Sequence, residues 1–232
     1  MPFIDTHCHL DFSDFDHDRA ALLHRCAEDG IQRIIIPGVT RSSWESQLVM
    51  QCDAPSMLHA VGLHPCFLTD FNESDFLELE RLLSQNKKLV AVGEIGLDKL
   101  AADLPLQIDV FEAQLQLAEK YHMPIILHVR KMHNEVLSIL RKTQFNYGGV
   151  VHAFSGSLDI ANSYIALGFK LGVGGVITYQ RANKTRVTIA SVPLTSLVLE
   201  TDAPDMPVYG HQGERNSPLY IKEIFKHLCD LR

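Results

Sequence analysis

The segment IDTHCHLDF, residues 4–12, begins as an apolar strand and then offers two histidines, His7 and His9. Residues two apart in an extended strand point to the same face, so both imidazoles are expected side by side, with Cys8 on the other face. Two neutral imidazoles held close together can bind one metal ion. Such a pair also arises in strands that bind no metal, so its meaning depends on what the other strands offer.

Short apolar runs alternate with amphipathic runs along the whole chain. The apolar runs predict strands over residues 3–7, 31–38, 57–64, 89–96, 124–129, 149–154, 170–175 and 196–201. Apolar residues spaced at i, i+3 and i+4 predict helices over residues 18–30, 75–86, 106–122, 133–143, 157–168 and 216–229.

Eight strands that read as continuous apolar runs predict a parallel sheet buried on both faces. This pattern favours an α/β fold of the (β/α)8 type, a TIM-like barrel, formed by a single domain over residues 1–232. The alternative is an open doubly wound sheet. It is less favoured because no Gly-x-Gly-x-x-Gly loop follows the first strand.

The composition is that of an ordinary water-soluble protein. A net charge of −7 argues against a broad basic surface for long duplex DNA or anionic membranes. The five cysteines are scattered and odd in number, which argues against a disulfide framework and favours the cytoplasm. We expect no signal peptide, no membrane span and no obligate protein partner.

Metal-capable side chains fall at the ends of six of the eight expected strands. In a (β/α)8 barrel the C-terminal ends of the strands meet at one rim, where catalytic residues sit. The second and seventh strands end in PGVT and GVGG and offer no ligand. The residues at the other ends are His7, His9, His64, Glu94, His128, His152 and Asp202. Each alone could be a hydrogen-bonded core residue or a cap, but core packing does not explain their shared position.

Four imidazoles and two carboxylates exceed the needs of one tetrahedral ion with an open position. They suit two ions about 3.5–4 Å apart that share a bridging carboxylate. Glu94 is the expected bridge, with His7, His9 and Asp202 on the first ion. His128 and His152 would hold the second ion. A metal-bound hydroxide would then be the nucleophile, and Asp202 would accept its proton.

Several blocks of this sequence resemble the signature motifs of the TatD-type metal-dependent hydrolases. They are DTHCHLDF, GLHP, GEIGLD, PIILHVR, VVHAFSGS, LGVGGVITY and LETDAPDM, and they cover nearly the whole chain. The resemblance implies a TIM-like barrel, a two-metal site and hydrolysis of phosphate esters, and some members of the family are DNases. It also implies that His64 acts near the scissile phosphate.

The sequence departs from this family at two places. The segment GLDKLAADLP is altered after GLD, where members usually carry a polar or aromatic residue that contacts substrate. The chain also ends at HLCDLR, whereas relatives usually continue with another helix. We therefore expect a truncated C-terminal layer, thin cover over the first and last strands, and lower stability than in an extended chain.

Hydrolysis of phosphate esters is the favoured function, with single-stranded or short DNA as the expected substrate. Arg130 and Arg215 are candidate phosphate-binding residues near the rim. The metals could be Zn²⁺, Mn²⁺, Mg²⁺ or Ni²⁺, because histidine and carboxylate ligands suit several ions. An amide or lactam hydrolase is the alternative, but such enzymes often bridge their metals with a modified lysine, and the fourth strand offers none before Lys99. A non-catalytic metal-binding protein is a third possibility.

Overall fold

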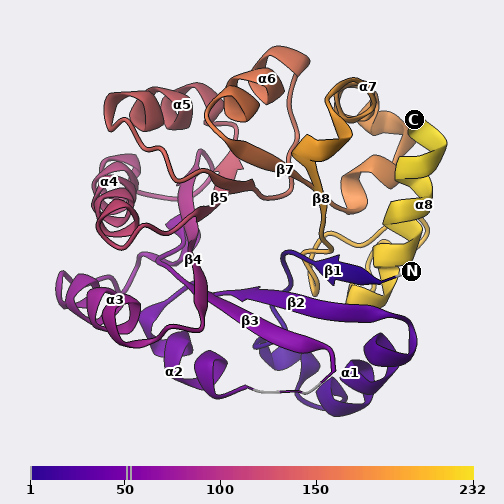
Figure 1. Ribbon diagram of the computed structural model, residues 1–232, viewed down its shortest axis with the longest axis horizontal. Coiled ribbons are helices and arrows are strands. Elements are labelled where there is room, and N and C mark those ends of the chain that lie inside the picture. The colour runs from indigo at the N-terminus through magenta and orange to yellow at the C-terminus, as the bar shows by residue number, and fades with distance from the viewer. Residues whose placement is uncertain (1, 51, 53) are drawn as a thin grey trace.

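Eight parallel strands lie in chain order, β1 to β8, around one axis in the computed structural model (Figure 1). The structure describes residues 2–50, 52 and 54–232. The strands are β1 (Phe3–Asp5), β2 (Ile31–Pro37), β3 (Ser56–Val61), β4 (Leu89–Asp98), β5 (Ile125–Arg130), β6 (Gly149–Val151), β7 (Phe169–Val173) and β8 (Leu197–Leu199).

The barrel closes between β1 and β8 through bonds at the ends of these two short strands. Thr6 N donates to Leu199 O at 3.0 Å, and Asp202 N donates to His7 O at 2.9 Å. His9 N donates to Ala203 O at 2.8 Å, which continues the contact beyond the strands. The predicted (β/α)8 barrel is therefore confirmed, and the open sheet is excluded.

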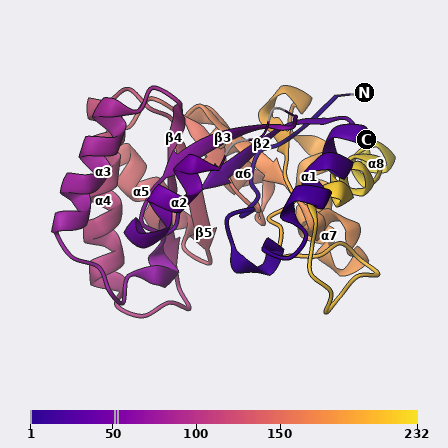
Figure 2. The same ribbon diagram turned by 90° about the horizontal axis from the view of Figure 1, so that it is seen from below.

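In the described part of the chain, eight α-helices cover the outside of the strands (Figures 1 and 2). They are α1 (Arg19–Glu28), α2 (Arg41–Val49), α3 (Ser74–Gln85), α4 (Leu104–Lys120), α5 (His133–Lys142), α6 (Leu158–Ala166), α7 (Asn183–Ser191) and α8 (Ile221–Leu231). Helices α2 and α7 were not predicted from the sequence, because both bury few apolar residues. The helix predicted over residues 216–229 begins later, after a 3-10 turn at Pro218–Tyr220.

The first strand, β1, and the last helix, α8, lie beside one another on the barrel wall (Figure 1). Phe3 of β1 packs edge-on against Phe225 of α8, with ring centroids 5.5 Å apart. A mainly apolar groove of about 310 Å³ opens here between β1, β8 and α8, and its lining includes Ile4, which is 44% exposed. The groove lies where the sequence analysis expected thin cover, and the expected effect on stability stays a prediction.

No helix in the described part of the chain is both long enough and apolar enough to cross a bilayer.

Candidate metal centre

The two histidines of the opening segment lie just beyond β1, which ends at Asp5 rather than at the predicted residue 7. Backbone bonds still hold this segment in place, because Cys8 N donates to Ile35 O of β2 at 3.1 Å and His9 N to Ala203 O. Cys8 is fully buried. The Nε2 atoms of His7 and His9 lie 3.2 Å apart, so the expected pairing of the imidazoles is present.

Glu94, from the middle of β4, lies at the centre of the cluster and is 1% exposed. Its Oε2 faces the first pair of imidazoles, 3.1 Å from His7 Nε2 and 3.6 Å from His9 Nε2. Its Oε1 faces three further imidazole nitrogens at 3.0–3.5 Å: His128 Nδ1, His64 Nε2 and His152 Nε2. The two oxygens of this carboxylate thus serve two separate groups of imidazoles.

Asp202 follows β8 and reaches both groups as well. Its Oδ1 lies 3.5 Å from His7 Nε2 and 3.7 Å from His9 Nε2, while Oδ2 lies 3.9 Å from His152 Nε2. Its backbone has a φ of 59°, in the left-handed region that aspartate tolerates better than most residues. Asp202 N donates to His7 O, which ties this conformation to the loop after β1.

Burial and mutual charge shift the pKa values of this cluster. Burial raises the pKa of Asp202 to about 6, against the lowering effect of His152 and His7. Burial would also raise the pKa of Glu94, but its interactions with the surrounding imidazoles, His152 and His7 foremost, outweigh burial and hold that pKa well below its usual range. Burial would lower the pKa of His152, but Asp202, Glu94 and Glu200 raise it to about 10.

The donor set fits divalent metal ions. Within residues 2–50, 52 and 54–232, no lysine or arginine forms an ion pair with Glu94 or Asp202, so these buried carboxylates have only imidazoles as partners. Buried carboxylates without a cation are costly. Within the described residues, three sets of donor atoms are close enough to share an ion: His7 with Glu94 and His152, His7 with His9 and Asp202, and His64 with Cys66 and His128. Nitrogen and carboxylate oxygen are ligands of Zn²⁺ and similar ions.

His64 begins the 3-10 turn at Pro65–Phe67 and lies at the same rim. Its Nδ1 accepts a hydrogen bond from Cys66 N at 3.0 Å. A neutral imidazole with an accepting Nδ1 carries its proton on Nε2. That Nε2 points to the cluster, 3.4 Å from Glu94 Oε1, so His64 offers a hydrogen-bond donor there.

The structure places the other rim cations differently. Arg130 is exposed, and its Nη1 lies 3.9 Å from Asp98 Oδ2, next to His128. Arg215 instead forms a bidentate pair with Asp18, at 2.7 and 2.6 Å, and its guanidinium lies over the Phe15 ring. The guanidinium of Arg215 is thus engaged within the scaffold rather than by the imidazole cluster.

Two buried carboxylates that sequence analysis missed stand directly behind the cluster. Asp98 ends β4 and is 1% exposed, and its Oδ2 lies 3.0 Å from His128 Nε2. Glu200 follows β8 and is fully buried, with Oε1 3.2 Å from His152 Nδ1. Asp98 ends the motif GEIGLD, and Glu200 lies in LETDAPDM. A search for acidic residues within four positions of a strand-end ligand would have found both.

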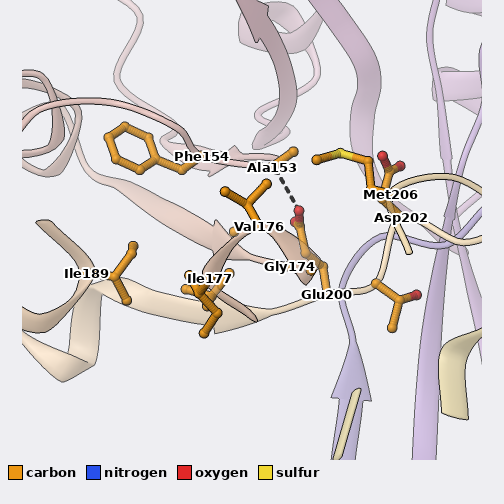
Figure 3. Close-up of a pocket in the computed structure, with 13 residues that line it drawn as sticks. Ala153, Phe154, Gly174, Val176, Ile177, Ile189, Glu200, Asp202 and Met206 are labelled. Carbon is orange, nitrogen blue, oxygen red and sulfur yellow. Dashed lines mark hydrogen bonds between the residues drawn. The ribbon is translucent and has the colours of Figure 1, made fainter. Parts of the chain in front are cut away.

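Figure 3 shows Glu200 below Ala153, whose backbone N–H donates to Glu200 Oε1 at 2.6 Å. The side chain fits here because β7 carries Gly172. A Cβ at that glycine would lie 2.1 Å from Glu200 Oε2. The GVGG segment, which offers no ligand itself, therefore leaves room for the glutamate behind His152.

Comparison with known proteins identifies the family. Residues 4–232 match the family described as TatD related DNase. The chain belongs to this family. The metal-dependent hydrolase YjjV of Escherichia coli K12 is 43% identical over 99% of this chain and 90% of its own length. Family membership makes the chain one of the metal-dependent hydrolases, and its cluster of histidines and carboxylates agrees with that class.

Solved structures agree with this TatD assignment. The crystal structure of E. coli YjjV superposes with a TM-score of 0.94 at 44% identity, covering 99% of this chain and 90% of that one. The phosphotriesterase homology protein of E. coli shares the fold alone, with a TM-score of 0.65 at 16% identity over 99% of this chain and 91% of that one.

Proposed function

We propose that this chain hydrolyses phosphate esters with two divalent ions, and that phosphodiesters in single-stranded or short DNA are its substrate class. The observation that carries the proposal is the placement of Glu94, whose Oε2 faces His7 and His9 while Oε1 faces His128 and His152. A carboxylate with one oxygen toward each group of imidazoles suits a bridge between two ions. The family's description as DNases supports the substrate class.

Bound divalent ions would polarise a phosphoryl oxygen and lower the pKa of a coordinated water. Asp202, whose carboxylate oxygens reach both groups of imidazoles, would accept a proton from the attacking water. His64 can donate a hydrogen bond from Nε2 to a phosphate oxygen, because Cys66 N holds its Nδ1 as the acceptor. The carboxylate and imidazole thus have separate roles, one as proton acceptor and one as donor.

The amide-hydrolase alternative gains nothing from the structure. Lys99, the first lysine after the start of β4, is exposed, and no ion pair joins it to the cluster in the described part of the chain. Glu94 occupies the position from which a modified lysine would have to bridge the ions.

Hydrolysis of bis(4-nitrophenyl) phosphate tests the proposed function. We expect chelator-treated protein to be inactive and added Mn²⁺ or Zn²⁺ to restore turnover. Asp202→Asn should lower kcat by about 10²–10⁴-fold, because the proton acceptor is lost while an oxygen ligand remains. Asp205→Asn, an exposed acid in the same loop, is the matched control and should match the parent. Turnover unaffected by chelator, or a lactam cleaved faster than the phosphodiester, would contradict the proposal.

A further inference from the structure

A groove between the loops after β7 and β8 adjoins the metal centre. Val176, from the turn after β7, and Met206, from the loop after β8, line a small cavity together with Asp202 (Figure 3). The same two residues also line a groove of about 240 Å³, whose other lining residues are Tyr179, Arg181, Ala182 and Pro207. The groove therefore shares its inner wall with the cavity beside Asp202.

The aromatic ring of this groove is fixed by contacts between the two loops. The Tyr179 hydroxyl donates to Pro207 O at 2.7 Å, and Tyr209 N donates to Thr178 Oγ1 at 2.8 Å. The guanidinium of Arg181 lies over the Tyr179 ring, with Cζ 5.0 Å from the ring centroid. A guanidinium stacked on a ring keeps the N–H groups at its edge free to bind an anion.

Charge favours an anion in this groove. Among the described residues no acidic side chain lines it, and none of their lysine or arginine ion pairs includes Arg181. The surrounding segment, residues 160–199, contains four lysines and arginines and no acidic residue. The loop after β7 is thus locally basic in a chain whose net charge is −7.

The larger groove between α2 and α3 has the opposite charge. Its lining includes two arginines and four acidic residues. Arg41 Nη1 lies 3.2 Å from Asp75 Oδ1, and Arg81 Nη2 lies 2.6 Å from Glu78 Oε1. Both arginines are therefore paired within that groove, and its excess of carboxylates disfavours a chain of phosphates.

We propose that the groove formed by Tyr179, Arg181 and Met206 binds a nucleotide that flanks the scissile phosphodiester. Sites for single-stranded nucleic acid combine cations for the backbone with rings that contact sugars and bases. Arg181 would bind the flanking phosphate, while the Tyr179 ring and the Met206 side chain, 36% exposed, contact the sugar or base. The inference rests on the proposed function and states where the substrate extends beyond the ions.

Kinetics on two substrate lengths test the subsite. The thymidine dinucleotide carries only the scissile phosphate, whereas a thymidine hexanucleotide also carries flanking ones. The parent should therefore show the lower KM for the hexanucleotide. Arg181→Ala should raise KM for the hexanucleotide about tenfold and KM for the dinucleotide far less. Arg181→Lys should recover part of the loss, because it keeps the charge without the planar fork.

Salt dependence of binding gives a second readout. Each phosphate contact on a single strand contributes about −0.7 to the slope of log affinity against log salt. In the slow Asp202→Asn background, with Mn²⁺ constant, Arg181→Ala should make the slope for the hexanucleotide shallower by about 0.7. Lys184→Ala, an exposed cation of the same segment that does not line the groove, is the matched control and should change neither KM nor slope.

The outcomes separate this inference from the proposed function. An equal rise of KM for both substrates in Arg181→Ala, or an equal loss in Lys184→Ala, would overturn the subsite. If the dinucleotide is cleaved in a metal-dependent reaction while Arg181→Ala matches the parent on the hexanucleotide, the subsite alone fails. If neither nucleotide nor bis(4-nitrophenyl) phosphate is cleaved, the proposed function fails with it.

Discussion

At the scale of single residues, the two rim arginines lead to opposite expectations. Arg130 is 58% exposed in its side chain and lies beside His128, whereas Arg215 is engaged by Asp18. Arg130→Ala should raise KM for bis(4-nitrophenyl) phosphate severalfold, because an exposed guanidinium next to the ions can hold a phosphate oxygen. Steady-state kinetics at saturating Mn²⁺ measure this effect.

Arg215→Ala is the matched variant. Its KM should equal that of the parent, while the free energy of unfolding falls by about 1 kcal/mol, since the lost pair is only partly exposed, with side chains 28% and 34% accessible. A rise of KM in Arg215→Ala with none in Arg130→Ala would reverse our assignment of the two side chains.

The sequence was sufficient to predict which side chains meet at the rim, because parallel strands of a barrel end on one side. It was insufficient for Asp98 and Glu200. Their role depends on which ring nitrogen of a neighbour points outward, and side-chain orientation is set by tertiary packing. The ion pair of Arg215 was not predicted for a similar reason, since its bidentate partner Asp18 is distant in the sequence.

At the scale of elements, β7 supports the site because Gly172 has no side chain and so leaves space for Glu200. Gly172→Ala would place a Cβ 2.1 Å from Glu200 Oε2, so the glutamate must move away from His152. We expect zinc affinity to fall by about 10–100-fold, as for loss of Glu200 itself. Chelator competition measures this change.

Gly174→Ala is the control on the same segment, because its Cβ would lie 3.5 Å from Glu200 Cγ, an ordinary contact distance. Its zinc affinity should equal that of the parent. Additive losses in the double variant Gly172→Ala with Glu200→Ala would refute a shared cause, since the two changes should act through the same side chain.

The elements that the sequence predicted well are those with strong apolar patterns. The long strands β2, β4 and β5 lie close to their predicted ranges, and α3, α4 and α5 do as well. The strands β1, β6 and β8 are shorter than predicted, because the chain turns away at the rim where the ligands lie. Helix α7 was missed because its buried positions include Thr185 and Thr188, which give little apolar periodicity.

At the scale of the whole molecule, charge limits how nucleic acid is bound. The net charge is −7. Of the two candidate arginines, Arg215 is paired with Asp18, and Arg130 remains exposed near the rim. A protein that neutralises many phosphates shows a salt slope near −0.9 per contact in duplex DNA. We expect the affinity for a short single strand to fall with salt as it would for about one or two phosphate contacts, with Mn²⁺ held constant. A steep slope would indicate a basic track that this account does not contain.

The central claim is that two ions lie on either side of Glu94. The most direct test is anomalous diffraction from zinc-soaked crystals, with data collected above and below the zinc absorption edge. We expect two anomalous peaks per chain, one beside His7, His9 and Asp202 and one beside His128 and His152, with Glu94 between them. A single peak, or peaks away from these residues, would contradict it.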